Sequence, residues 1–126
     1  MEHIISLLRP LDPKFPTKRQ LEIETGPVVL VNSFTLDKAG EPGFLKIWQD
    51  DAAYMRRQPG FISTQLHRAL GESPACLDCA VWESKAAFRA AFSNPDFQVK
   101  LSAYPSSAVA TPHLFQKAAV PDICVA

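Results

Sequence analysis

Apolar residues recur at strand spacing near position 30 and at helical spacing immediately afterwards. Residues 28–36 are β-branched or aromatic on both faces, which predicts a strand that is covered on both sides. From about Pro42 to Gln58 the apolar residues repeat every three or four positions, and Pro59-Gly60 follows. This pattern predicts an amphipathic helix that lies on a core and ends at that proline.

Further along, the pattern predicts two strands that form an antiparallel hairpin, a helix capped by Ser84, a helical turn and a last strand. In order, these elements are expected at about 61–69, 75–83, 85–92, 94–104 and 113–120. The order β-α-β-β-α-β is that of an α+β, ferredoxin-like fold with a four-stranded antiparallel sheet. Two helices cover one face of such a sheet, and the other face is not strongly polar. We therefore expect a homodimer joined through its sheet faces.

The two ends of the chain differ from this middle part. Residues 1–26 contain Pro10, Pro13 and Pro16 and are expected to form an extended N-terminal arm without a regular helix, apart from one helical turn near Ile4 to Leu8. The folded domain is expected at residues 27–120, and residues 121–126 are expected to form a C-terminal tail.

Composition narrows the possible partners. The chain has 126 residues, 47% of them hydrophobic, and its 13 basic residues balance 13 acidic ones. Zero net charge favours neither a nucleic acid nor a membrane as partner, and no apolar run approaches the roughly 20 residues that span a bilayer. The start lacks the features of a signal peptide, and three cysteines are an odd number. We therefore expect reduced thiols and a cytoplasmic location.

Standard cofactor and metal motifs are absent from the sequence. It contains no G-x-G-x-x-G, phosphate loop, H-E-x-x-H or G-x-S-x-G pattern. Cys76 and Cys79 have C-x-x-C spacing, but in a strand they point to opposite faces and no second pair of ligands matches them. We expect no metal and no cofactor.

A few residues could form a site under the helices. Asn32 lies in mid-strand, where its amide either bonds to neighbouring backbone or is left free to bind a substrate or oxygen. Trp82, Trp48, Phe88 and Phe92 could line one cavity with it, although each could equally belong to the core. Tyr54 has the same two readings. His67 is a candidate base because it would share a face with Phe61 and Ser63, and a purely structural histidine is the alternative.

Four segments carry a family resemblance. The runs VVLVNSFTLD, FLKIWQDDAAYMRRQPGFISTQLHRAL, AVWES and TPHLFQK, within about residues 27–120, resemble the antibiotic biosynthesis monooxygenase (ABM) domain family. The resemblance implies the dimeric α+β barrel fold. Family members include cofactor-free oxygenases of polyketide anthrones and quinols, haem-degrading oxygenases and small isomerases, so the fold alone does not define the reaction.

The resemblance also suggests roles for single residues. Trp82 matches the tryptophan that follows the third strand, Asn32 occupies the position of a first-strand asparagine, and Arg68 is the candidate for the arginine of the anthrone oxygenases. The stretch Lys85 to Phe97 has no histidine, which argues against haem degradation.

The expected function is therefore a cofactor-independent monooxygenase acting on a small quinol-like or anthrone-like aromatic molecule. In it Trp82 supplies a wall and an N–H donor, Asn32 an amide donor, and His67 the base, provided that it faces the pocket. The expected substrate-binding residues are Trp48, Tyr54, Arg68, Phe88 and Phe92. The alternatives are a non-enzymatic dimer that binds a small molecule or assists a pathway, and an isomerase or lyase on the same fold.

Overall fold

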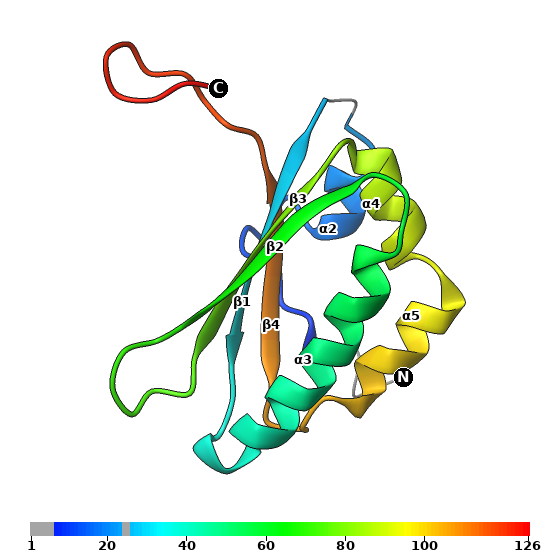
Figure 1. Ribbon diagram of the computed structural model, residues 1–126, viewed down its shortest axis with the longest axis vertical. Helices are drawn as coiled ribbons and strands as arrows, with labels where there is room; N and C mark the ends of the chain where they lie inside the picture. The colour runs from blue at the N-terminus through cyan, green and yellow to red at the C-terminus, as the bar shows by residue number, and fades with distance from the viewer. Residues whose placement is uncertain (1–6, 24–25) are drawn as a thin grey trace.

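A computed structural model describes residues 7–23 and 26–126 of the chain. Four strands form one antiparallel sheet in the order β2-β3-β1-β4 (Figure 1). The strands are β1 (Val28–Thr35), β2 (Phe61–Arg68), β3 (Cys76–Trp82) and β4 (Val109–Phe115), and the main helices are α3 (Glu41–Arg56), α4 (Lys85–Phe92) and α5 (Pro95–Lys100). This order confirms the predicted α+β, ferredoxin-like arrangement.

Local sequence signals explain where the helices begin. The Ser84 hydroxyl accepts a hydrogen bond from the Ala87 N–H at 3.1 Å, and the Asn94 side chain accepts one from the Asp96 N–H at 2.8 Å. Both residues act as N-caps, so each satisfies an N–H that has no partner within its helix. Helix α3 has a proline in its first turn and follows a short 3-10 helix, Lys38–Gly40.

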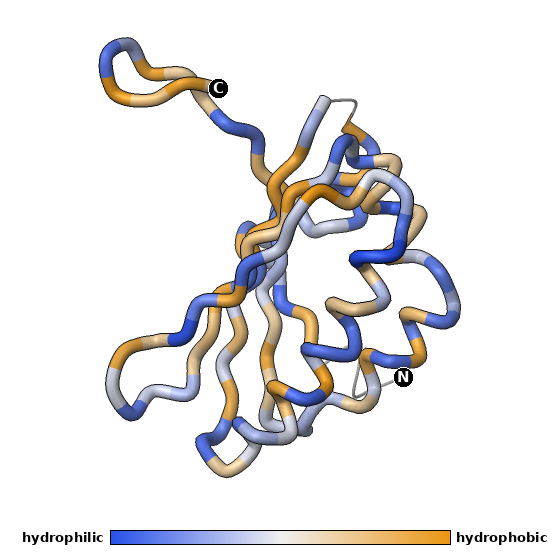
Figure 2. Tube along the Cα trace, viewed as in Figure 1, coloured by the Kyte–Doolittle hydropathy of each residue, from blue (hydrophilic) through white to orange (hydrophobic). Residues whose placement is uncertain are grey.

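The helices cover one face of the sheet and leave the other face open (Figure 1). In β3 the alternate residues Cys76, Asp78, Ala80 and Trp82 are buried and point to the helix side. Figure 2 shows hydrophobic segments along the strands, interrupted by hydrophilic ones. On the open face Leu77 is 37% exposed. The sheet therefore has one fully covered face and one partly exposed face.

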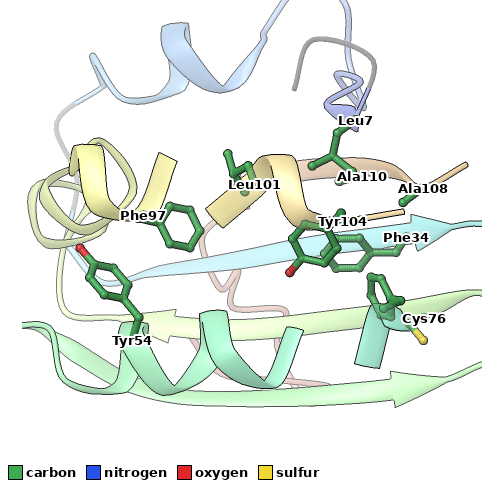
Figure 3. Close-up of a cluster of buried hydrophobic side chains, with 10 residues drawn as sticks. Leu7, Phe34, Tyr54, Cys76, Phe97, Leu101, Tyr104, Ala108 and Ala110 are labelled. Carbon is green, nitrogen blue, oxygen red and sulfur yellow. The ribbon is translucent and has the colours of Figure 1, made fainter. Parts of the chain in front are cut away.

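Aromatic residues fill much of the space between the sheet and the helices. Phe34 of β1 packs edge-on against Phe44 of α3, with ring centroids 4.9 Å apart, and stacks on Tyr104 at 6.1 Å. Tyr54 stacks on Phe97 at 5.5 Å (Figure 3). These contacts hold α3 and the segment after α5 against the sheet.

A β-bulge near the start of β2 changes which residues share a face. Phe61 is opposite Trp82, and Ser63 is opposite Val81, so the pairing with β3 shifts by one residue between them. Phe61 therefore points to the helix side with Trp82, whereas Ser63 points to the open face. The expectation that Phe61 and Ser63 lie on one face was wrong for this reason.

The N-terminal arm is more ordered than its prolines suggested. It contains a four-residue helix, α2 (Thr17–Gln20), directly after Pro16. Proline is tolerated at a helix start, because the N–H that it lacks would have no partner there. The expectation of an arm without a regular helix was wrong in this respect. The helical turn predicted near Ile4 to Leu8 lies mostly outside the described residues.

Side chains and backbone of the arm attach it to the edge strand β4. Leu8 forms a parallel bridge with Ala110, and the Arg9 N–H donates to the Ala110 carbonyl at 2.7 Å. The Gln20 side chain accepts from the Leu114 N–H at 2.7 Å. Leu7 is 1% exposed, so the arm is part of the core as well as the cover of this sheet edge.

The last strand begins earlier than the sequence predicted. It covers Val109–Phe115, not 113–120, and Pro112 lies in its middle. The Ala110 carbonyl and the Leu114 N–H both point toward the arm. Alternate residues of a strand direct their backbone groups to the same side, so the nitrogen of Pro112 also points toward the arm and away from β1. Proline therefore costs no hydrogen bond with β1. After Phe115 the chain leaves the sheet and turns at a bridge between Val120 and Cys124 (Figure 1).

Candidate functional site

A cavity of about 80 Å³ lies between the helix side of the sheet and the helices. Most of its lining side chains are apolar, and they come from all four strands, from α3, α4 and α5, and from the arm. Six lining residues are polar: Thr17, Asn32, Asp51, Thr64, Asp78 and Tyr104. An apolar space with a few polar groups is typical of a small-molecule site.

Asn32 occupies the middle of the sheet wall of this cavity. It lies in β1, opposite Asp78 on β3 and Pro112 on β4. Its Oδ1 is buried and has no hydrogen-bond partner among the described residues. Leaving a buried acceptor unpaired costs about 1–3 kcal/mol. The sequence left open whether this amide bonds to neighbouring backbone or is free to bind a ligand. Its oxygen forms no bond to backbone among the described residues.

Trp82 provides a second unpartnered polar atom on the same wall. The residue is only 1% exposed, and its Nε1 has no hydrogen-bond partner among the described residues. Phe61 packs against the indole edge-on at 5.3 Å and 89°, and Phe88 packs against it at 5.8 Å and 68°. A buried tryptophan N–H normally finds an acceptor, so this donor is available to a ligand.

Asp78 adds a carboxyl group beside Asn32. It is 9% exposed, and its Oδ1 accepts a hydrogen bond from the Thr64 hydroxyl at 2.6 Å. Burial raises the pKa of Asp78, while the Thr64 hydroxyl and the nearby charge of His67 oppose the rise. The group therefore holds a proton more readily than an exposed aspartate.

Asp51 of α3 faces the cavity from the helix side. It is 6% exposed, and burial raises its pKa from 3.8 to about 6. A hydrogen bond with the Tyr104 hydroxyl and the charge of Lys100 oppose this rise. Burial of the Tyr104 hydroxyl and the nearby Asp51 carboxylate raise the pKa of Tyr104, which therefore stays protonated.

Three of the predicted aromatic residues do line the cavity. Trp48 of α3 and Phe88 and Phe92 of α4 all contribute to its walls. Tyr54 does not: its ring packs on Phe97, and its hydroxyl donates to the Ala91 carbonyl at 3.3 Å. Tyr54 therefore connects α3 with α4 and α5, and it is not placed to touch a ligand in this cavity.

His67 and Arg68 lie away from the cavity. The bulge in β2 puts His67 opposite Leu77 on the open face, where it is exposed, so the condition that it face the pocket is not met. Arg68 is at the end of β2 and donates two hydrogen bonds to the Glu41 carboxylate, at 3.0 and 3.3 Å. It does not line the cavity. The expected roles of both residues in this site are therefore corrected.

The sequence analysis missed the two buried carboxyl groups, although both interrupt an apolar pattern. Asp51 follows Phe44 and Trp48 at helical spacing and precedes Met55, on the apolar stripe of α3. Asp78 alternates with Cys76, Ala80 and Trp82 on the buried face of β3. A charged residue at a core position is rare unless it is paired or functional, and this is the signal that could have found them.

No metal site is found in the described part of the chain. Within residues 7–23 and 26–126, no group of three or more histidine, cysteine or acidic side chains is arranged to hold a metal ion. Cys76 is buried on the helix side, whereas Cys79 is opposite Val31 and points to the open face. No helix among these residues is long and apolar enough to cross a membrane.

Comparisons with known proteins agree with this architecture. Deoxynogalonate monooxygenase from Streptomyces nogalater is 33% identical over 82 residues, which are 65% of this chain and 69% of the relative. The crystal structure of SnoaB, a cofactor-independent oxygenase from Streptomyces nogalater, superposes with a TM-score of 0.70 at 28% identity. That match covers 78% of this chain and 99% of SnoaB.

Similarity in fold extends to more distant proteins. A Caulobacter crescentus protein that is 18% identical shares the fold, with a TM-score of 0.67 and coverage of 75% of this chain and 92% of that one. The model of the family described as antibiotic biosynthesis monooxygenase matches residues 27–99. That match includes Asn32, Asp51, Asp78 and Trp82, and it excludes the arm. This chain belongs to the antibiotic biosynthesis monooxygenase family.

Proposed function

We propose that this chain is a monooxygenase that needs no cofactor and oxidises an electron-rich aromatic molecule of the quinol or anthrone class. The observation that carries the proposal is that Asn32 and Trp82 each bury a polar atom, Oδ1 and Nε1, that has no hydrogen-bond partner among the described residues. One is an acceptor and the other a donor, and both residues line a mainly apolar cavity. A flat ligand would satisfy both if it has a hydroxyl group that donates to Asn32 Oδ1 and an oxygen that accepts from Trp82 Nε1.

The chemistry requires only the substrate and dioxygen. An anthrone loses a proton, and the resulting electron-rich anion passes an electron to oxygen. In the balanced reaction, a CH₂ group and O₂ become a C=O group and water, so the substrate supplies all the electrons. The protein has to exclude water, accept the proton and stabilise the anion as charge develops.

We assign these tasks to three side chains. The Trp82 N–H donates to the developing oxyanion, and Asn32 Oδ1 accepts from a substrate hydroxyl. This role of Asn32 differs from the expected donor role, because the atom without a partner is the acceptor. Asp78 takes the substrate proton in place of His67, since it lines the cavity directly opposite Asn32. Trp48, Phe88 and Phe92 form the hydrophobic walls.

Oxygen consumption with anthrones and hydroquinones tests this function. We expect Asn32→Leu and Trp82→Phe each to lower kcat/KM by about 100-fold, the typical loss for one transition-state hydrogen bond. Because Asn32 Oδ1 has no partner among the described residues, the leucine variant should remain folded. Gln49→Leu is the matched control, since Gln49 is exposed on α3 and does not line the cavity.

The alternatives give different results in the same assay. An isomerase or lyase consumes substrate without consuming oxygen. A non-enzymatic binding protein binds the aromatic compound and leaves it unchanged. The proposal is wrong if no anthrone or quinol supports oxygen uptake, or if both variants keep the wild-type rate.

We also propose that the open sheet face joins two copies of the chain. Val29, Val31 and Val81 are only half-buried there, and Phe115 is 41% exposed. A neutral chain gains by covering such a surface. Val31→Asp should convert the dimer to a monomer in sedimentation velocity, and a wild-type protein that sediments as a monomer would rule the proposal out.

We also propose that the protein is located in the cytoplasm. Cys76, Cys79 and Cys124 are free thiols, as is usual in a reducing compartment. Detection of the tagged protein in a periplasmic or secreted fraction would contradict this location.

A further inference from the structure

A groove of about 610 Å³ runs between the arm and helices α4 and α5. Parts of the arm between Leu8 and Glu22 line it on one side, and the helices contribute Arg89, Phe92 and Gln98. We call this space the outer groove. It is several times larger than the inner cavity and lies within the usual size range of ligand sites, roughly 300–1,000 Å³.

The outer groove and the cavity share walls. Leu8, Thr17, Phe92 and Pro112 line both spaces and therefore form a wall that the two share. The cavity alone, at about 80 Å³, is too small for a fused ring system. A larger substrate has to displace side chains of the cavity wall. Displacing the shared side chains joins the cavity to the outer groove, which is already open.

The outer groove is also basic, although the whole chain is neutral. Arg9 and Lys18 of the arm and Arg89 of α4 line it, and Glu22 is the one carboxylate that lines it among the described residues. Among the residues that the structure describes, none of these three cations has an ion-pair or hydrogen-bond partner for its side chain. Their charges are therefore not neutralised within the described chain.

We propose that the outer groove binds the anionic group of the substrate while the aromatic ring reaches the cavity beside Asn32 and Trp82. The substrate class is thus an aromatic molecule that carries a carboxylate. This inference rests on the proposed function and adds to it. Arginine forms paired hydrogen bonds to a carboxylate, and lysine adds a point charge.

Two of the three cations lie on the arm, outside the residues that the family model matches. Arg9, Lys18 and Thr17 precede residue 27, where the match to the family model begins. The arm is held in place by Gln20, which bonds to β4, and by the Lys85 ammonium group, which donates to the Leu21 carbonyl at 2.9 Å. The cations are therefore carried on an anchored segment.

Binding of a substrate-like acid tests the inference without requiring turnover. Anthraquinone-2-carboxylate is already oxidised, and its carboxamide is a neutral analogue of nearly the same shape. By calorimetric titration at about 0.05 M salt, we expect the acid to bind about tenfold more tightly than the amide. Raising the salt to about 0.5 M should remove most of this preference.

Substitutions locate the effect. In the double variant Lys18→Gln, Arg89→Gln the two compounds should bind with nearly equal affinity, while binding of the amide stays unchanged. Lys46→Gln, an exposed charge change on α3 outside the groove, is the matched control and should keep the tenfold preference. The inference is overturned if wild type does not prefer the acid, or if the double variant keeps the preference.

The inference and the proposed function fail separately. If anthrones support no oxygen uptake but the acid is preferred through Lys18 and Arg89, the groove assignment stands and the reaction is wrong. If acid and neutral anthrones are oxidised with equal kcat/KM, the reaction stands and the groove assignment is wrong.

Discussion

Replacing Asp51 with asparagine should make the protein more stable at neutral pH. The Asp51 carboxyl is buried at the cavity wall, and burial raises its pKa from 3.8 to about 6. The folded protein therefore holds this proton more tightly than the unfolded chain between about pH 4 and pH 6. As the pH rises through this window, the carboxyl loses its proton and its contribution to stability declines.

The size of the expected stabilisation follows from the pKa shift of Asp51. About 2 pKa units, the difference between 3.8 and about 6, correspond to about 3 kcal/mol of unfolding free energy. An asparagine carries no charge at any pH, and its carbonyl can accept the hydrogen bond of the Tyr104 hydroxyl. We therefore expect Asp51→Asn to exceed wild type by up to about 3 kcal/mol near pH 7 and to match it below about pH 4.

Urea denaturation at several pH values from about 4 to about 7 measures this difference. The wild-type-minus-variant curve isolates Asp51, because all other titrating groups are common to both proteins. Asp50 is the matched control on the same helix: it is exposed, forms an ion pair with Lys100 at 2.8 Å, and has a pKa lowered mainly by that partner. Its contribution is present at neutral pH and is lost as the pH falls through the lowered pKa.

The two neighbouring substitutions should therefore change stability in opposite directions. Asp50→Asn should lower the unfolding free energy at neutral pH, whereas Asp51→Asn should raise it. The reasoning is refuted if Asp51→Asn is less stable than wild type near pH 7, or if its stability depends on pH in the same way as that of wild type.

Two further predictions concern the backbone and the proposed base. Gly60→Ala should destabilise the protein by more than about 2 kcal/mol, because Gly60 has a φ of +85° and a new Cβ would collide with the Ala87 Cβ. Gly71→Ala, with a φ of +69° in open space, should cost clearly less in thermal unfolding, and equal losses would contradict this reasoning. In the oxygen assay, kcat/KM should rise with pH as Asp78 loses its proton, and Asp78→Asn should abolish that rise and lower the rate about 100-fold. Thr64→Val should move the rise to higher pH, because the Thr64 hydroxyl lowers the pKa of Asp78; an unchanged profile in both variants would exclude Asp78 as the base.

Most of the fold could be predicted because its signals are local. The β-branched run that forms β1, the caps at Ser84 and Asn94, and the proline that ends α3 each act on a few neighbouring residues. Strand alternation also predicted that Asn32 would share a face with apolar neighbours, and it lies on the helix side of the sheet with Leu30 and Phe34. The period of an element follows directly from backbone geometry, so it is visible in sequence.

The errors arose where a distant partner decides the outcome. A bulge needs a register between two strands, and that register turned His67 to the open face. Pro112 is accepted within β4 because β4 is an edge strand whose outward side meets the arm. Arg68 was assigned to the substrate, but Glu41 lies within reach and binds it.

The amino-acid sequence by itself determined the order and type of the elements, the position of Asn32 and Trp82 on strands, and the resemblance to one family. Only the tertiary structure decided that Asn32 Oδ1 and Trp82 Nε1 have no partner among the described residues, that Asp51 and Asp78 are buried at the same cavity, and that the arm lines this cavity as well. The physical reason is that burial and hydrogen-bond satisfaction depend on groups far apart in the chain, whereas periodicity, caps and turns depend on neighbours.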